Sequence, residues 1–126
     1  MKPYTVNPQA EEQYLHLHFR GQVSAQDVKQ ALEHASEFLG AREWTRLLID
    51  CTESTSQLPT IDLYDLASQS IHLLRRNTRV ALVAAPVRAS DASFVENVTR
   101  NRGLQLTAFV DAVEARAWLK GKHFSK

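Results

Sequence analysis

The residues that could do chemistry in this sequence are few and far apart. Cys51 is the single cysteine and closes an apolar segment where ligands of α/β proteins often bind, so it is a candidate nucleophile or redox thiol. A free cysteine more commonly packs as a small, inert hydrophobe, which is our preferred interpretation. His16 and His18 point to the same side of one predicted strand and could hold a metal ion. No cysteine or carboxylate pattern completes such a site, so a polar strand face is favoured.

Other patterns of catalysis and of ligand binding are missing. The four glycines, at positions 21, 40, 103 and 121, form no phosphate loop, dinucleotide fingerprint or nucleophile elbow. Fifteen Lys and Arg residues against fourteen Asp and Glu residues give a net charge of +1. No apolar run approaches the roughly 18 residues of a membrane helix. We therefore expect a non-enzyme without metal or cofactor, which neither binds nucleic acid nor is an integral membrane protein.

The cysteine count and the N-terminus bear on the compartment. One cysteine cannot form an internal disulfide bond. The first residues do not combine a basic start with the apolar run of a secretory signal. Both observations favour a cytoplasmic protein.

Local patterns predict an N-terminal hairpin. Residues 2–6 are β-compatible, and residues 7–12 form a polar turn. Residues 14–20 then alternate between apolar and polar side chains, which is the period of a strand with one dry face. This strand should lie toward a sheet edge or have one poorly covered face.

The rest of the chain alternates between helices and strands. Ser24 and Asp27 form a capping-box pattern at the start of a helix that should end at Gly40. The apolar runs 46–51 and 79–85 are typical of strands buried on both faces. Further helices are expected over 60–76, 90–103 and 112–119, with Thr60, Ser90 and Asp111 at their starts, and a last strand over 104–109. The prediction is one α/β domain over residues 1–126, a mostly parallel, mixed sheet of about five strands with about four helices.

This order of elements resembles the SpoIIAA-like and STAS group of small bacterial domains. The matching phrases are Val23–Asp27, Leu47–Asp50, Arg79–Val83, Ala108–Asp111 and Glu114–Leu119. The pattern Glu-Ala-x-x-Trp-Leu in the last phrase is the most distinctive. The resemblance covers nearly the whole chain and implies a SpoIIAA/STAS-like fold related to the CRAL-TRIO lipid-binding domains.

The resemblance also directs attention to hydroxyls after Asp50. In STAS anti-sigma-factor antagonists, a serine after the central strand accepts a phosphate, which the amides and dipole of a helix N-terminus stabilise. The candidates here are Ser54, Ser56 and Thr60. The family's Asp-Ser-Ser-Gly or Asp-Ser-Thr-Gly pattern is absent, and Leu58-Pro59-Thr60 stands near its place. We therefore expect Thr60 to cap the helix and the serines to solvate a loop.

The helix predicted over 60–76 has an unusually wide apolar surface. Its expected buried stripe consists of Leu63, Tyr64, Ala67, Ile71 and Leu74. Leu66 and Leu73 fall beside that stripe, which predicts a second contact for the helix. That contact could be another chain, an apolar ligand or a neighbouring helix.

Two functions remain open at this stage. The first is a non-enzymatic regulatory or protein-interaction module of STAS type, with a homodimer or another protein as partner. The second is a carrier of a small apolar molecule or lipid, held under this helix and the loop Thr52–Pro59. The candidate interaction or ligand surface comprises Leu66, Leu73, Thr52, Ser54, Ser56, Leu58 and Thr60.

Overall fold

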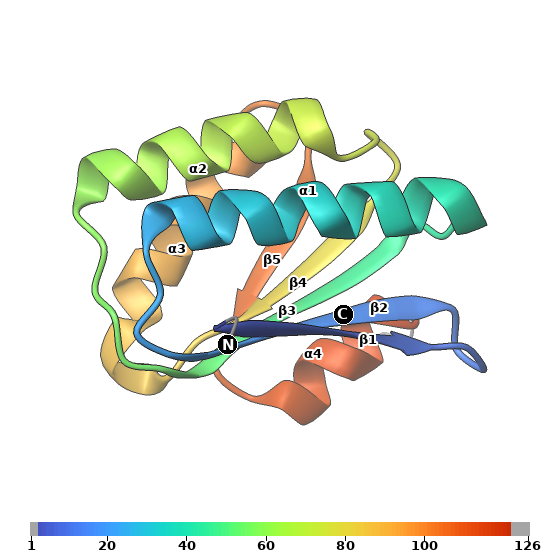
Figure 1. The fold of residues 1–126 in the computed structure, drawn as a ribbon, viewed down its shortest axis with the longest axis horizontal. Coiled ribbons are helices and arrows are strands. Elements are labelled where there is room, and N and C mark those ends of the chain that lie inside the picture. The colour runs from blue at the N-terminus through green and yellow to red at the C-terminus, as the bar shows by residue number, and fades with distance from the viewer. Residues whose placement is uncertain (1–2, 122–126) are drawn as a thin grey trace.

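A computed structural model describes residues 3–121 and shows a five-stranded sheet in the order β1-β2-β3-β4-β5 (Figure 1). The strands are β1 (Tyr4–Gln9), β2 (Tyr14–Gly21), β3 (Arg46–Ser54), β4 (Arg79–Val83) and β5 (Gln105–Phe109). β1 and β2 form the predicted antiparallel hairpin, but β1 runs to Gln9, through half of the predicted turn over residues 7–12. The pairs from β2 to β5 are parallel. The predicted mixed, mostly parallel sheet is confirmed.

Helices cover both faces of the sheet (Figure 1). The helices are α1 (Ala25–Arg42), α2 (Thr60–Leu73), α3 (Ala89–Arg100) and α4 (Ala112–Leu119), with a short 3₁₀ turn η1 (Pro86–Arg88) before α3. α1, α2 and α3 lie on one face, and α4 packs on β3, β4 and β5 from the other. None of the helices within residues 3–121 is long and apolar enough to cross a membrane.

The sheet therefore separates two apolar cores. Leu15, Leu17 and Phe19 of β2 point toward the α1 side, where they join Leu32 and Leu39 in the larger core. The smaller core, under α4, is built from Tyr14, Leu48, Ala81, Val83, Ala115 and Leu119. The alternation of β2 is thus the pleat of a strand that sends successive side chains into different environments.

The ends of α1 show one confirmed and one wrong prediction. Ser24 and Asp27 form the capping box, in which each side chain accepts a hydrogen bond from the other residue's backbone N–H. The helix does not end at Gly40, because it continues to Arg42 and the left-handed residue is Glu43, with φ 58°. The ring of Trp44 packs on Phe38, with 5.8 Å between ring centroids, and such a contact across a helix C-terminus stabilises the later stop.

The predicted caps of α2 and α3 are also wrong. Pro59 occupies the N-cap position of α2, its carbonyl accepts the N–H of Leu63, and Thr60 is already the first helical residue. η1 leads directly into α3, so Arg88 is the N-cap and Ser90 lies inside the first turn. Neither helix has a side-chain cap, and α2 ends at Leu73 rather than near residue 76.

Side chains of α3 cover the outer edge of β5. The Arg100 Nε donates to the carbonyl of Leu106 at 2.9 Å, and the Ala108 N–H donates to Glu96 Oε1 at 3.2 Å. Arg100 and Glu96 also form an ion pair at 3.3 Å. Because the backbone groups at this edge already have partners, the contacts oppose the addition of another strand there.

Candidate functional site

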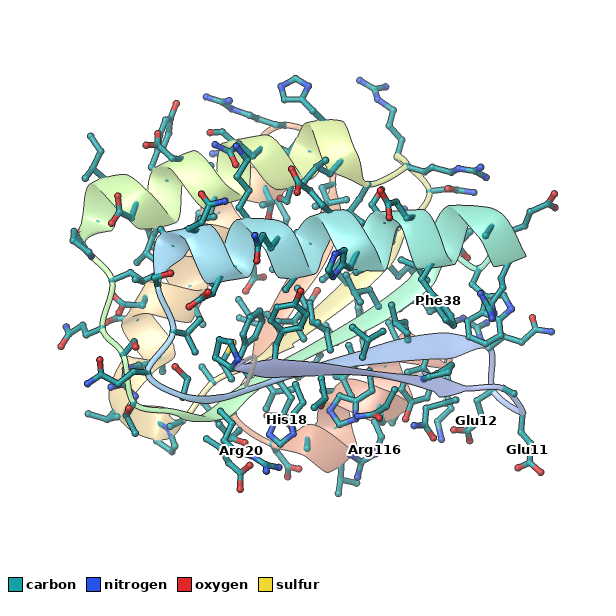
Figure 2. All side chains as sticks on the ribbon, in the orientation of Figure 1. Glu11, Glu12, His18, Arg20, Phe38 and Arg116 are labelled. Carbon is teal, nitrogen blue, oxygen red and sulfur yellow. The ribbon has the colours of Figure 1, made fainter. Side chains whose placement is uncertain are left out.

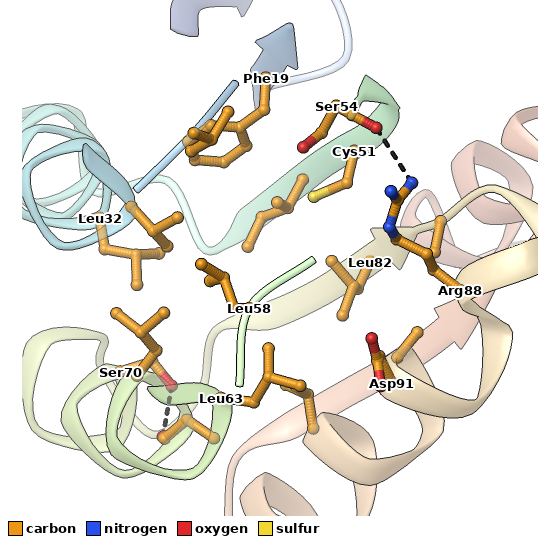
Figure 3. A pocket seen from close by; sticks show the side chains of 18 of the residues that line it. Phe19, Leu32, Cys51, Ser54, Leu58, Leu63, Ser70, Leu82, Arg88 and Asp91 are labelled. Atoms are coloured by element: carbon orange, nitrogen blue, oxygen red, sulfur yellow. Dashed lines mark hydrogen bonds between the residues drawn. The ribbon is translucent and has the colours of Figure 1, made fainter. Parts of the chain in front are cut away.

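An apolar cavity of about 170 Å³ lies between the sheet and α2 (Figure 3). It exists because α2 packs mainly against α1 and α3 and stands off the strands beneath it. The lining includes Phe19, Ile49, Val80, Leu82 and Leu106 from the strands and Leu32, Leu63, Leu66, Ala67, Ala92 and Val95 from the helices. This is the place under helix 60–73 where a carrier of apolar molecules would hold its ligand.

The loop after β3 closes one end of the cavity and is fixed by hydrogen bonds. The Thr55 N–H donates to the carbonyl of Gly21 at 2.9 Å. The Val23 N–H donates to Ser56 Oγ at 2.5 Å, and the Ser56 N–H approaches Ser54 Oγ at 3.4 Å. Both serine hydroxyls therefore accept hydrogen bonds from backbone N–H groups, and both residues are half-buried.

Arg88 reaches this loop from the other side. Its terminal nitrogens donate to the carbonyls of Ser54 at 3.1 Å and Thr55 at 3.0 Å. Figure 3 shows the bond to Ser54. Its Nε is buried and donates to no acceptor within residues 3–121. Arg88 and Asp91 are the charged side chains among those that line the cavity.

The candidate surface from the sequence is only partly assembled. Ser54, Ser56, Leu58 and Leu66 meet at the cavity. Leu73 packs instead against the larger core, where its carbonyl accepts the hydroxyl of Ser36 at 2.6 Å. The remaining two candidates, Thr52 and Thr60, are exposed.

The apolar side of α2 also differs from the predicted stripe. Tyr64 is 41% exposed, and its hydroxyl accepts a hydrogen bond from Arg102. Leu66 takes its place on the inward side, next to Ala67 and Leu63. The structure thus gives the two additional leucines of α2 contacts within the chain, and the homodimer stays a prediction.

Cys51 lines the cavity and is poorly suited to nucleophilic chemistry. Burial, followed by the negative charge of neighbouring Asp50, raises the pKa of its thiol to about 12. Since the thiolate is the reactive form, the thiol is inert at neutral pH. Its contribution to the cavity wall is that of a small apolar side chain.

The two histidines lie on the opposite face of the sheet. Their rings stack with 5.7 Å between centroids, and Figure 2 shows His18 and Arg20 on the side where α4 lies. The Nε2 atoms of His16 and His18 lie 3.5 Å from Asp50 and 3.0 Å from Glu53. Within residues 3–121, no group of three or more His, Cys, Asp or Glu side chains is arranged to hold a metal ion.

Asp50 is held as a carboxylate on this histidine face. Burial alone would raise its pKa, but the His16 ring, whose Nε2 lies 3.5 Å away, and hydrogen bonds from the N–H and hydroxyl of Thr52, at 3.0 and 2.7 Å, override that effect. The pKa of Asp50 therefore lies well below its usual range. A carboxylate held in this way is unsuited to act as a general acid near neutral pH.

The structure also reveals features that sequence reasoning missed. The strongly exposed large hydrophobic residues within 3–121 are Ile61, Val87, Val110 and Val113, with Tyr64 exposed to a smaller degree. Ile61 and Tyr64 lie in α2, which follows β3, and Val87 lies in η1, which follows β4. Val110 and Val113 follow β5, just before and within the first turn of α4. Val87 and Arg88 lie in a short apolar stretch with one proline, where the sequence offers no recognisable motif.

The fold is that of a small α/β domain, with a mixed five-stranded sheet and helices on both of its faces. The sequence model of the SpoIIAA-like family matches residues 14–120, so the chain belongs to the SpoIIAA-like family. No curated protein matches the chain.

Two solved structures share the fold. An uncharacterised DUF3478-family protein with a SpoIIAA-like fold, from Shewanella loihica, is 20% identical, with a TM-score of 0.58 over 92% of this chain and 91% of that chain. An anti-sigma factor antagonist from Mycobacterium paratuberculosis is 14% identical, with a TM-score of 0.65 over 93% of this chain and 92% of that chain. At these identities, the likeness concerns the fold.

Proposed function

We propose that this protein is a non-enzymatic regulatory module of STAS type that acts by binding a protein chain, either a second copy or another protein. The observation that carries the proposal is the placement of the exposed apolar residues. Val87 is 84% exposed and Ile61 is 70% exposed, and both follow the carboxyl ends of central strands. Single exposed hydrophobics are ordinary. Their placement on segments that follow the carboxyl ends of the strands supports a binding surface, because binding residues concentrate on segments that a rigid scaffold positions.

The chemistry of the site supports a binding role over a catalytic one. The Cys51 thiol is protonated because burial raises its pKa. The Ser56 hydroxyl accepts a backbone N–H, and Asp50 is engaged by Thr52 and His16. These groups are committed to structural contacts, so none combines the proximity and activation that a nucleophile requires.

The edge of the sheet beside α3 is an unfavourable place for a partner. Glu96 and Arg100 satisfy the backbone of β5 at that edge, which opposes strand addition. The exposed apolar side chains lie instead in the first turns of α2, in η1, and just before and within the first turn of α4. A partner would therefore bind through side chains of η1 and of the starts of α2 and α4. We also propose that the protein is cytoplasmic, in keeping with its single cysteine, which forms no internal disulfide bond.

The test is a comparison of two surface variants with a matched control. Ile61→Glu and Val87→Glu each place a charge on a proposed contact, whereas Gln30→Glu places the same side chain on the exposed side of α1. Each tagged protein is purified from its native host, and the co-purified partner is quantified by mass spectrometry. We expect Ile61→Glu and Val87→Glu to lose the partner by at least about tenfold, since a buried, unpaired charge is strongly unfavourable at an interface. Equal retention by all three variants would contradict the proposed surface.

The cavity under α2 favours a second candidate function, the carriage of a small apolar molecule. Its concave, apolar lining, partly open to solvent, is the kind of environment that ligand sites of proteins provide. Organic extraction of the natively purified protein, followed by mass spectrometry, tests this function. A stoichiometric apolar compound would support it, and an extract free of such compounds would contradict it.

A further inference from the structure

The core beneath α2 is incompletely filled by the chain itself. Leu82 lies on the central strand β4, and Leu63 and Leu66 lie on the inward side of α2, yet all three line the cavity and are only half-buried. Side chains between a sheet and its covering helices are normally close-packed. An engineered cavity of about 150 Å³ in another protein holds benzene, and the volume here is about 170 Å³. The cavity therefore has room for at least one large apolar side chain from outside the domain.

Two of the segments that line the cavity also carry the most exposed apolar side chains. Leu63 lines it from α2, and Ile61, 70% exposed, lies two residues earlier in the same helix. Arg88 lines it from η1 (Figure 3), and the adjacent Val87 is 84% exposed. The apolar lining is thus continued on the surface by Ile61 and Val87.

This arrangement favours a protein segment over a small molecule as the occupant. A small molecule in the cavity would leave Ile61 and Val87 in water. A segment lying across the start of α2 and η1 would cover both side chains and could place one of its own in the cavity. Since removal of apolar surface from water is the main driving force of association, the segment gains more from this site than a small molecule does.

The charges beside the cavity favour a basic segment. Asp91 lines the cavity, and Asp62 directly follows Ile61. Within residues 3–121, neither carboxylate forms an ion pair. The nearby cation, Arg88, directs its terminal nitrogens to backbone carbonyls of the loop after β3. A Lys or Arg of a partner would therefore complement Asp91 and Asp62.

We propose that the partner inserts one large apolar side chain into the cavity under α2, from a segment that crosses the start of α2 and η1 and sets a Lys or Arg against Asp91. The inference rests on the proposed interaction function and names the chemistry of its partner. The cavity is then the pocket for the anchor residue, and Ile61 and Val87 form the border that excludes water around it.

The first test fills the cavity. Leu66→Phe and Leu82→Phe enlarge two lining side chains, and Leu73→Phe makes the same change on α2 at a position outside this cavity, as the matched control. Each tagged protein is purified from its native host, its folding is checked by circular dichroism, and the co-purified partner is quantified by mass spectrometry. We expect the two filled variants to retain the partner at least about tenfold less than wild type, the loss of one anchor, and the control to stay within about twofold.

The second test locates the anchor. A photo-crosslinking residue at position 61 identifies the contacting segment of the partner, and a synthetic peptide of that segment is the probe. Calorimetry measures its binding to the whole protein, and NMR detects contacts between the peptide and the methyl groups of Leu82. We expect such contacts, a loss of affinity of about tenfold or more when the apolar residue of the peptide is replaced by Ala, and a loss of about two- to fivefold for Asp91→Asn.

The outcomes separate this inference from the function on which it rests. Loss of the partner from Ile61→Glu and Val87→Glu, with full retention by both filled variants, would overturn the insertion and leave the interaction function standing. Full retention by all four variants would contradict both. If the filled variants unfold, the peptide decides: binding without contacts to Leu82, or unchanged affinity for Asp91→Asn, would overturn the insertion. A small apolar molecule extracted from the intact complex would also overturn it, in favour of the carrier function.

Discussion

At the scale of single residues, the two serine hydroxyls of the loop after β3 accept hydrogen bonds from backbone N–H groups. Ser56 Oγ accepts the N–H of Val23, which is buried. Ser54 Oγ has the weaker contact, with the Ser56 N–H at 3.4 Å. The sequence predicts only that both serines solvate a loop. The bond between Val23 and Ser56 joins positions 33 residues apart, so no local pattern indicates it.

Replacement of Ser56 is therefore expected to reduce stability. Ser56→Ala leaves the buried Val23 N–H without its acceptor, and we expect a loss of about 1–3 kcal/mol in the free energy of unfolding. Chemical denaturation measures the loss, with Ser54→Ala as the control that should lose less. Thr60→Ala should change stability by less than about 0.5 kcal/mol, because Thr60 is not the N-cap. Equal stability of Ser56→Ala and wild type would contradict the assigned role of the hydroxyl.

The same contacts bear on phosphorylation. A phosphate on Ser56 would break the Val23 bond, and Ser54 is half-buried beside Arg88. Thr60 is exposed, but it lacks the serine-glycine pattern of phosphorylated STAS domains. We predict that protein isolated from its native host is unphosphorylated at all three positions. Phosphopeptide mapping is the direct measurement, and a substantial phosphorylated fraction would place the protein among the phospho-regulated antagonists.

Asp50 is predicted to make stability depend on acid pH. Its pKa is lower in the folded protein than the unfolded value of about 3.9, so its contribution is fully present above that value and declines as the pH falls below it. We expect wild type to lose more stability than Asp50→Asn between about pH 5 and pH 2. Denaturation midpoints across this range measure the difference. Parallel curves for the two proteins would show that Asp50 is not held as described.

At the scale of elements, α4 shows how a distinctive sequence pattern relates to packing. Trp118 is half-buried, contacts the ring of Phe109 and lies under the guanidinium of Arg79 at 4.2 Å. Leu119 is the fully buried residue of the pair. Trp118, the most recognisable residue of the pattern, thus covers the edge of the smaller core, whereas Leu119 is buried inside that core.

Two truncations in α4 test this assignment. Leu119→Ala should cost about 2–5 kcal/mol, the range for a buried leucine. Trp118→Ala should cost less than the roughly 3–5 kcal/mol of a fully buried aromatic residue, because part of the ring is already in water. Thermal or chemical denaturation gives both values. A larger loss for Trp118→Ala than for Leu119→Ala would show that the tryptophan is the main anchor of α4.

The elements themselves were predictable where their signals are local. The period of β2, the apolar runs of β3 and β4 and the capping box at Ser24 depend on residues close in sequence. The caps of α2 and α3 were missed because Thr60 and Ser90 have the favoured side chains but the wrong positions. The turn η1 and the extended conformation of Pro59 shift the first helical residue.

At the scale of the whole molecule, the sequence predicted the architecture but only part of the site. The resemblance to SpoIIAA-like domains rests on sequence segments that form the core or cap helices. These segments indicate how the chain packs. The cavity depends on how far α2 stands from the sheet, which the contacts of α2 with α1 and α3 determine. Arg88 was missed for a related reason, since its importance comes from the carbonyls of Ser54 and Thr55 rather than from its neighbours in sequence.

The central claim is that this protein works by binding a protein chain, and native mass spectrometry of the protein purified from its native host tests it most directly. The account predicts that the wild-type mass includes a second protein chain, either another copy or a different protein, and that the mass of the Val87→Glu variant does not. A wild-type protein that is monomeric under conditions that preserve known complexes would contradict the account.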